Sequence, residues 1–598
     1  ITGTVLDENN EPVIGASVVQ KGVSGNAVAT DAFGHFKLRV PLGAPLMVSY
    51  VGYKTIEIKA AQDLTVYLEP TSEMLNELVA IGYGSQKRAN LTGAVSTVDV
   101  DRTLEGRPYQ DLSKALQGAV PGLTITSGSG TLDEASSIRI RGIGTLSNSS
   151  SGKPLIVVDG VEMDDMSYLN TQDIESISVL KDAASTAIYG TRAAFGVILI
   201  QTKGADKRDK ISIKYTNNFA WDQATYLPSY PTVPEQLRAG IAGVKRATGE
   251  RANGFGIFYD ELLPYAELWE QQNPGKKLGY GEMREYVDDN NVGDYKGPNG
   301  QALYYANWDV AGIWFNNAAP SNSHNVSING ASGKTQYYMN FGYDGKQGLM
   351  NFNPDKMRKY NVSLNINTQL TKWLTAGARI NFTRRSYSRP NTYWTNQLNT
   401  VWRWGSWFGP WGTIDGEDFR LIADRKDART RTTQTDMLRM TAYLKADITK
   451  DLVLNADFTY WTRSRNEKGG DGYVYGINSW NRDTEASMIV AQTSSYTDRS
   501  NSKQNTWNMN VYATYNHTWN DAHNFTAMFG VNAQSERYDW FEASRSNLYS
   551  LALPELNLAS GVPTVDYKAW HKTYAGYFAR LNYNYKDKYL LEVNGRYD

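Results

Sequence analysis

The fold of this chain is constrained most by a regular alternation of short and long connections. They join segments in which apolar and polar residues alternate at every second position. After Lys210, apolar and polar residues alternate as in β-strands with one apolar face. The eleven expected strands lie near residues 211–221, 323–330, 335–343, 359–370, 373–384, 434–448, 451–463, 505–519, 522–534, 571–586 and 588–597. Their connections are alternately short (331–334, 371–372, 449–450, 520–521 and 587) and long (222–322, 344–358, 385–433, 464–504 and 535–570).

A transmembrane β-barrel requires this order, because its periplasmic turns are tight and its external loops are long. The fold of a soluble propeller or sandwich does not require connections that alternate between short and long. Bacterial single-chain barrels have an even number of strands, since an unpaired edge in lipid would leave backbone groups without hydrogen bonds. The odd number of strands therefore predicts that the chain is truncated at Asp598 and that further strands lie beyond it.

The composition agrees with a barrel and excludes several other classes. Lys plus Arg number 61 against 62 Asp plus Glu, so no basic surplus indicates a nucleic-acid partner. No run of eighteen apolar residues predicts a membrane helix, while 39 Tyr and 16 Trp fit the aromatic girdles of a barrel. The chain has no Cys, which excludes disulfides, thiol catalysis and Cys-based zinc sites.

Residues 1–70 are expected to form a small β-sandwich, because short alternating strands are broken by turn residues. The strings GTVLD, PVIGASV, TDAFGHF and SYVGY resemble the carboxypeptidase regulatory-like domain. The segment holds only His35 and no zinc-binding set, so we expect a structural or docking module rather than a peptidase.

Residues 71–90 are expected to be a linker that carries a short apolar strand, Glu77, Leu78, Val79, Ala80 and Ile81. An exposed strand of this kind can add to the sheet edge of a partner, although an ordinary connecting strand is the alternative. The string MLNELVAIGYGSQKR resembles the TonB-box region of SusC-like TonB-dependent transporters. That resemblance implies a TonB-binding role for these five residues.

Residues 91–208 are expected to form a mixed α/β domain, with a helix at 108–117 and strands at 123–127, 137–141, 155–158, 177–180 and 197–201. The strings ALQGAVPGLTIT, IRIRG, PLIVVDGV and ISVLKDAASTAIYGTRAAFGVILIQTK resemble the SusC-like plug domain. Because SusC-like barrels have 22 strands, the resemblance makes residues 209–598 the N-terminal half of one. Arg139, Arg141 and Asp159 are candidates for polar contacts that let the plug move, or else for ordinary stabilising pairs.

The loop between the fifth and sixth expected strands is rich in aromatic residues and is followed by carboxylates. Indole faces suit the apolar faces of sugar rings, so this loop is a candidate glycan-binding surface. The alternatives are a core of the loop itself, an interfacial belt or a contact with a partner protein. The candidate residues are Tyr393, Trp394, Trp402, Trp404, Trp407, Trp411 and Asp415. Residues 234–247 and 260–272 have a helical pattern, which predicts that the connection 222–322 is a folded lid.

No catalytic constellation is found. The five His residues form no HExxH pair, and no GxSxG elbow occurs, so we expect neither an enzyme nor a resident metal or cofactor.

The resemblance implies import across the outer membrane of a Gram-negative bacterium, with the plug and the N-terminal domain on the periplasmic side. TonB, with ExbB and ExbD, would supply the energy, and a SusD-like surface lipoprotein would cap the barrel, often in a dimer of SusC–SusD pairs. We expect a glycan as the substrate and lipid around the barrel. Oligopeptide import and a surface receptor or adhesin without transport are the alternatives.

Overall fold

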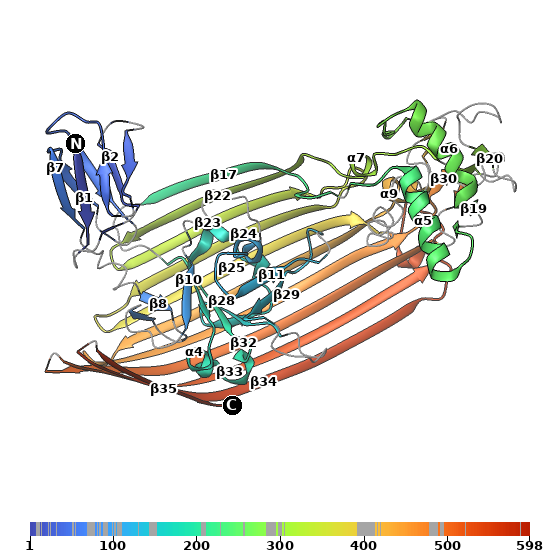
Figure 1. Ribbon diagram of the computed structural model, residues 1–598. Helices are drawn as coiled ribbons and strands as arrows, with labels where there is room; N and C mark the ends of the chain where they lie inside the picture. Colours follow the sequence, from blue (N-terminus) through green and yellow to red (C-terminus); the bar gives the residue numbers. More distant parts are fainter. Residues whose placement is uncertain are drawn as a thin grey trace.

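The computed structural model is mainly β and places a plug-like domain against one long curved sheet (Figure 1). It describes residues 1–598 except 8–11, 14, 22, 24–25, 32, 51–52, 54, 69–77, 81, 83–84, 88–93, 99, 101–102, 104–110, 129–130, 143–151, 205–210, 228, 255–256, 283–294, 297–301, 304, 392–412, 415–416, 419, 478–487, 491–494, 521 and 587. The N-terminal domain lies near the ends of the sheet strands that short turns join, and the helices α5 and α6 lie at the opposite end.

The N-terminal domain consists of two small sheets, β4-β1-β7 and β3-β2-β5-β6, as expected for a sandwich. Alternate residues such as Val18, Leu46 and Val48 are fully buried between them, and Phe36 is 4% exposed. The strands are β1 (Thr2–Leu6), β2 (Ser17–Gln20), β3 (Ala27–Ala29), β4 (His35–Lys37), β5 (Pro45–Ser49), β6 (Ile56–Lys59) and β7 (Asp63–Tyr67).

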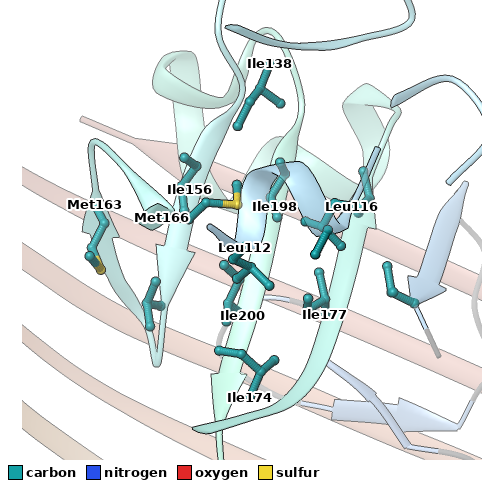
Figure 2. Packing of buried hydrophobic residues seen from close by; sticks show 14 of the residues in the cluster. Leu112, Leu116, Ile138, Ile156, Met163, Met166, Ile174, Ile177, Ile198 and Ile200 are labelled. Carbon is teal, nitrogen blue, oxygen red and sulfur yellow. The ribbon is translucent and has the colours of Figure 1, made fainter. Parts of the chain in front are cut away.

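The plug-like domain has a five-stranded mixed sheet in the order β10-β15-β16-β13-β14, in which β13 and β16 are parallel, and a separate hairpin β11-β12. Leu112 of α3 and Leu116, which follows that helix, pack with Ile156, Ile177 and Ile198 of the sheet (Figure 2). The strands are β10 (Val95–Val98), β11 (Leu123–Thr126), β12 (Ser137–Ile140), β13 (Leu155–Val158), β14 (Val161–Met163), β15 (Ile174–Leu180) and β16 (Val197–Thr202). The helical segments are α3 (Leu112–Ala115), η2 (Met166–Tyr168), η3 (Thr171–Asp173), α4 (Ala183–Thr186) and η4 (Ala187–Ala193).

The large sheet has eleven antiparallel strands, each hydrogen-bonded to its neighbour in sequence. The strands are β17 (Ser212–Asp222), β22 (Ala319–Ser332), β23 (Thr335–Gln347), β24 (Lys356–Gln369), β25 (Leu374–Pro390), β28 (Thr430–Asp447), β29 (Leu452–Asp471), β32 (Tyr496–Trp519), β33 (His523–Ser546), β34 (Thr564–Tyr585) and β35 (Tyr589–Tyr597). All eleven expected strands are confirmed in order. Several of the expected external ends were wrong, because those strands run farther out: β33 ends at Ser546 rather than at 534.

The two faces of the large sheet follow from its registers. Odd-numbered residues of β24, such as Lys359 and Asn361, contact the plug-like domain and are buried, so this face is called inward. Even-numbered residues, such as Tyr360 and Val362, point the other way and are exposed, so that face is called outward. Inward residues are mostly polar and outward residues mostly apolar, which is the pattern of a membrane barrel.

The first long connection folds into a lid with its own apolar core, as predicted. A capping box begins α5 (Val233–Thr248): the Thr232 amide just before the helix donates to the Glu235 carboxylate in its first turn, and Gly249 ends the helix with φ of 72°. Trp269 of α6 (Tyr259–Gln272) and Trp314 of α7 (Val310–Trp314) are each 1% exposed in this core. Met350 and Ile422 join the same core from the next two external connections, Ile422 from α9 (Arg420–Lys426).

The remaining elements are short. They are β8 (Leu78–Ala80), β9 (Ser85–Lys87), β18 (Asn253–Gly254), β19 (Ile257–Phe258), β20 (Tyr295–Lys296), β21 (Ala302–Leu303), β26 (Thr413–Ile414), β27 (Glu417–Asp418), β30 (Tyr475–Ile477), β31 (Met488–Val490) and η6 (Leu556–Leu558). Within the described ranges, no helix combines the length and apolar character needed to span a membrane.

Candidate functional site

The plug-like domain is attached to the inward face by charged and polar contacts, and Asp159 makes a buried ion pair there. It follows β13 with φ of 50° and pairs with Arg439 of β28 at 3.0 Å, both side chains being 4% exposed. Arg379 of β25 lies 3.8 Å away, and Thr202 donates from its amide and its hydroxyl. Burial opposes ionisation of Asp159, but the two guanidinium groups and the Thr202 hydrogen bonds hold its pKa below the ordinary value.

A second buried carboxylate, Asp173, ends η3 and faces β23 and β24. It accepts hydrogen bonds from the Tyr338 hydroxyl (2.8 Å), the Asn340 amide (2.7 Å) and the Ser363 hydroxyl (2.5 Å). Burial raises the pKa of Asp173, and these neutral donors only partly oppose the rise. The large sheet, with its inward face toward the plug-like domain, is called the wall. The two carboxylates therefore attach the same domain to the wall by different means, Asp159 by ion pairs and Asp173 by hydrogen bonds.

Between these two points, the turn at η2 receives long side chains from the wall. Arg385 pairs with Asp133 at 2.8 Å and lies over the Tyr168 ring at 4.6 Å. The Lys359 ammonium donates to the Leu169 carbonyl at 3.3 Å, and the Asn361 amide donates to the Tyr168 carbonyl at 3.1 Å. Much of this contact is made to backbone carbonyls, so it does not depend on a matching side chain in the plug.

The few apolar contacts with the wall extend the core of the plug-like domain. Met437 and Trp461 join the cluster of Figure 2, and Met528 and Phe578 pack against Ile188 and its neighbours. The interface is otherwise polar. Because hydrogen bonds to protein can be exchanged for hydrogen bonds to water, such an interface separates at lower free energy than an apolar core of the same size.

A cavity of about 450 Å³ lies between the plug-like domain and the wall. Its lining includes Asp159 and Tyr189 on one side and Arg379, Tyr443 and Asn510 on the other. Charged and polar side chains form part of its lining, and the cavity is large enough for several water molecules.

The short strand β8 is followed by Gly82, which lines this cavity. The backbone of this strand pairs antiparallel with β9, with Val79 opposite Gln86, and β8 contacts β15 of the plug-like domain. Gly82 follows with φ of 77°, and a Cβ at that position would lie 3.1 Å from Ile188. Glycine is therefore required where this hairpin meets the plug.

The predicted site residues are placed as follows. Leu78, Val79 and Ala80 form β8, whereas Glu77 and Ile81 lie outside the described residues. Asp159 lies at the wall, whereas Arg139 and Arg141 are exposed and make no ion pair with the wall within the described part of the chain. All the candidate glycan-binding residues, Tyr393, Trp394, Trp402, Trp404, Trp407, Trp411 and Asp415, lie outside the described residues.

Sequence reasoning missed the wall residues Arg439, Arg385 and Lys359. One signal was present: Arg439 stands in the otherwise apolar string MLRMTAYL, where a charged inward residue needs a buried partner. No group of three or more side chains that could hold a metal ion occurs among the described residues.

Comparisons with known proteins agree with this architecture. The model of the TonB-dependent receptor plug domain matches residues 87–197, and that of the CarboxypepD_reg-like domain matches residues 1–80. A TonB-dependent receptor of Formosa agariphila is 27% identical over all of this chain and 52% of its own length. The TonB-dependent receptor SusC of Bacteroides thetaiotaomicron is 31% identical over 61% of this chain and 32% of its own length.

Among solved structures, the RagAB peptide importer in its open-open state superposes with a TM-score of 0.67 at 22% identity. The match covers 87% of this chain and 56% of that one, and at this identity it shows the fold alone. This chain likewise spans about half the length of the first two curated relatives, 52% and 56%.

A plug domain seated on a barrel wall defines the class: a β-barrel receptor of the Gram-negative outer membrane. Within that class, the chain belongs to the SusC-like TonB-dependent receptors, a non-enzymatic family, and its eleven-stranded sheet covers about half of such a barrel.

Proposed function

We propose that this receptor imports a nutrient across the outer membrane by TonB-coupled displacement of its plug. The observation that carries the proposal is the polar seating of the plug, in which Asp159 and Asp173 are held by groups of the wall rather than by a continuous apolar core. A force on β8 would act on the plug through its contact with β15 and could widen the neighbouring cavity. The outer membrane has no ATP, so the force must come from the inner membrane through TonB, ExbB and ExbD.

The role of β8 as the TonB-binding strand is tested by a substitution in its backbone ladder. Val79→Pro removes the amide that a paired strand needs, and Val79→Thr retains it. We expect the proline variant to lose uptake of labelled substrate at least tenfold, with binding at the cell surface unchanged and the threonine variant close to wild type. Undiminished uptake by the proline variant would refute energy-coupled import, and surface binding without uptake in the wild type would indicate a receptor or adhesin.

For the substrate we propose an oligosaccharide, bound in part by the aromatic loop that contains Trp404 and Trp407. Trp404→Ala with Trp407→Ala should weaken binding of one glycan at least tenfold, because the variant loses two large aromatic faces on which the apolar faces of sugar rings can pack. Trp373→Ala is the control, because Trp373 lies in a short turn at the opposite end of the barrel and is 52% exposed. If wild type and variant bind every tested glycan with equal affinity, the aromatic loop does not bind the substrate and its role is structural.

An oligopeptide is the second candidate, supported by the fold shared with the RagAB peptide importer. Cells that depend on this receptor can be given labelled oligosaccharides and oligopeptides of similar mass. Uptake of peptides alone would replace the glycan proposal and leave the import proposal intact. We also propose a SusD-like lipoprotein as a partner above the lid, which co-purification with affinity-tagged receptor would test.

A further inference from the structure

The outward face of the large sheet changes character toward its external end. At the level of the membrane its outward residues are apolar and exposed, and they include Val362, Ile380, Met440, Phe458, Met509 and Phe529. The strand registers place these residues in one band across the sheet. Acyl chains cover such a band in an outer-membrane barrel.

Outward residues beyond this band are largely polar, and they include several basic side chains beside the carboxylates of Asp436 and Asp539. The basic residues are Lys356 and Arg358 on β24, Arg384 on β25, Lys468 on β29, Arg499 and Lys503 on β32, and Arg537 on β33. Some have partners: Arg384 pairs with Asp436 at 2.7 Å, and Arg499 pairs with Glu555 at 3.0 Å. Lys356 and Arg358 are exposed and have no hydrogen-bond or ion-pair partner among the described residues.

Two grooves meet at Lys356 and Arg358, which line both. The larger groove, of about 660 Å³, crosses the external ends of the strands from β24 to β33 and also contains Lys468, Arg499 and Phe541. The smaller, of about 280 Å³, lies over β17, β22 and β23 and contains Phe219 and Trp221. Phe219 is 59% exposed and Trp221 is 68% exposed, so aromatic side chains flank the free basic pair.

We propose that these joined grooves bind an anionic lipid of the outer leaflet, with a phosphate of its headgroup held by Lys356 and Arg358. The Arg358 guanidinium can take phosphate oxygens in a bidentate manner, and the Lys356 ammonium adds a second positive charge. Arg358 and Val362 are four residues apart on β24, or roughly 13 Å along the strand. A lipid whose phosphate lies at Arg358 therefore lays its acyl chains on the apolar band, while Trp221 packs at the interface as interfacial tryptophans do.

The position of the grooves favours a lipid over a protein or a free anion. The basic positions run directly into the lipid-facing band on the same strands, so anything bound there contacts both the headgroup layer and the acyl layer. Among the described residues that line the larger groove, Glu467 is the only carboxylate, against four basic side chains, so the charge complements a phosphate. The proposal requires residence in the outer membrane and does not depend on which substrate is imported.

The test measures lipid binding by the receptor purified in a neutral detergent. The probe is a diphosphorylated, acylated glucosamine disaccharide in mixed micelles, compared with its dephosphorylated form and with inorganic phosphate. The variant is Lys356→Gln with Arg358→Gln. The matched control is Lys245→Gln with Arg246→Gln, which removes the same charge from exposed positions on the lid helix α5.

We expect the groove variant to bind the phosphorylated lipid at least tenfold more weakly than wild type, and the lid variant to stay within twofold. Wild type should also prefer the phosphorylated to the dephosphorylated lipid at least tenfold, and this preference should weaken as salt is added. An unchanged affinity of the groove variant, or equal binding of the two lipids, would overturn the proposal. Competition by inorganic phosphate at the concentration at which the lipid saturates would also overturn it, because the site would then take a free anion. Unchanged melting temperatures establish that both variants are folded.

Discussion

At the scale of single residues, Asp159 and Asp173 show how one plug domain can be held by two opposite electrostatic environments. Both are buried plug carboxylates that face the wall. The pKa of Asp159 is lowered, because Arg439 and Arg379 outweigh the effect of burial. The pKa of Asp173 is raised, because burial outweighs its neutral hydrogen-bond donors. Removal of the charge should therefore have different consequences at the two positions.

Asp159→Asn should strongly destabilise the contact between plug and wall, whereas Asp173→Asn should change the stability of that contact little. The first leaves the Arg439 guanidinium buried without a counter-charge, which costs about 3–5 kcal/mol, and Asn tolerates the positive φ. The second keeps the shape and can still bond to Tyr338, Asn340 and Ser363, so we expect a change within about 1 kcal/mol. Native-state hydrogen exchange of the β13 and η3 amides measures both. Equal loss of protection in the two variants would contradict this account.

The raised pKa of Asp173 also predicts a pH dependence. Contact with the wall favours the protonated form of the Asp173 carboxyl. Asp173 therefore stabilises the contact between plug and wall most at low pH, and this stabilisation is lost as the pH rises from the ordinary pKa of 3.8 through the raised pKa. Asp159 has a lowered pKa, so its contribution to the stability of the contact between plug and wall is constant above pH 3.8. We expect η3 amides, corrected for intrinsic exchange, to gain protection as the pH is lowered toward 3.8. The gain should be smaller in Asp173→Asn; an identical gain there would assign it to other groups.

The sequence allowed Asp159 to be named as a candidate but not its partners. Asp159 stands in a string typical of the plug, whereas Arg439 is one of many inward polar residues on the strands. An inward polar residue can face lumen water or a plug carbonyl, and the pattern of period two is the same in both cases. The lowered and raised pKa values depend on such tertiary contacts and have no local signature.

At the scale of elements, the strands were predicted well at one end and poorly at the other. The short turns were placed correctly because the apolar alternation reaches them. At the external end, the outward positions of β32 become Arg499, Asn501 and Lys503, and the alternation is lost. The backbone ladder does not need that alternation, so β32 begins at Tyr496 rather than at 505. Hydropathy therefore marks the membrane boundary rather than the end of the strand.

The lid should unfold locally without affecting the barrel, because its core is separate from that of the plug. Trp269→Ala removes a side chain that is 1% exposed and should destabilise the lid by about 3–5 kcal/mol. Leu268→Ala, at the preceding position of α6 and 43% exposed, is the matched control. Limited proteolysis should cleave the first variant much faster between residues 233 and 272. Melting of the barrel together with the lid would show that the two are one cooperative unit.

At the scale of the whole molecule, the contacts from Asp159 to Asp173 join the plug to four consecutive wall strands, β23, β24, β25 and β28. Transport by plug displacement requires all of these contacts to break in one cycle. A single covalent bond between plug and wall should therefore stop uptake without changing how substrate binds outside. Because residues 1–598 include no Cys, an introduced pair meets no competing thiol within them.

Asn170 of the plug and Gly342 of β23 offer a position for such a bond. A Cβ at Gly342 would lie 3.5 Å from the Asn170 Cγ, close to where the sulfur of a cysteine at 170 would lie. We expect Asn170→Cys with Gly342→Cys to lose uptake when oxidised and to regain it with a reductant. The control, Asn325→Cys with Gly342→Cys, shares one residue and joins two strands of the wall, since Asn325 and Gly342 are ladder partners. It should transport in both redox states. Uptake by the oxidised plug-to-wall pair would mean that substrate passes beside a seated plug, through the cavity next to Asp159, and that displacement is unnecessary.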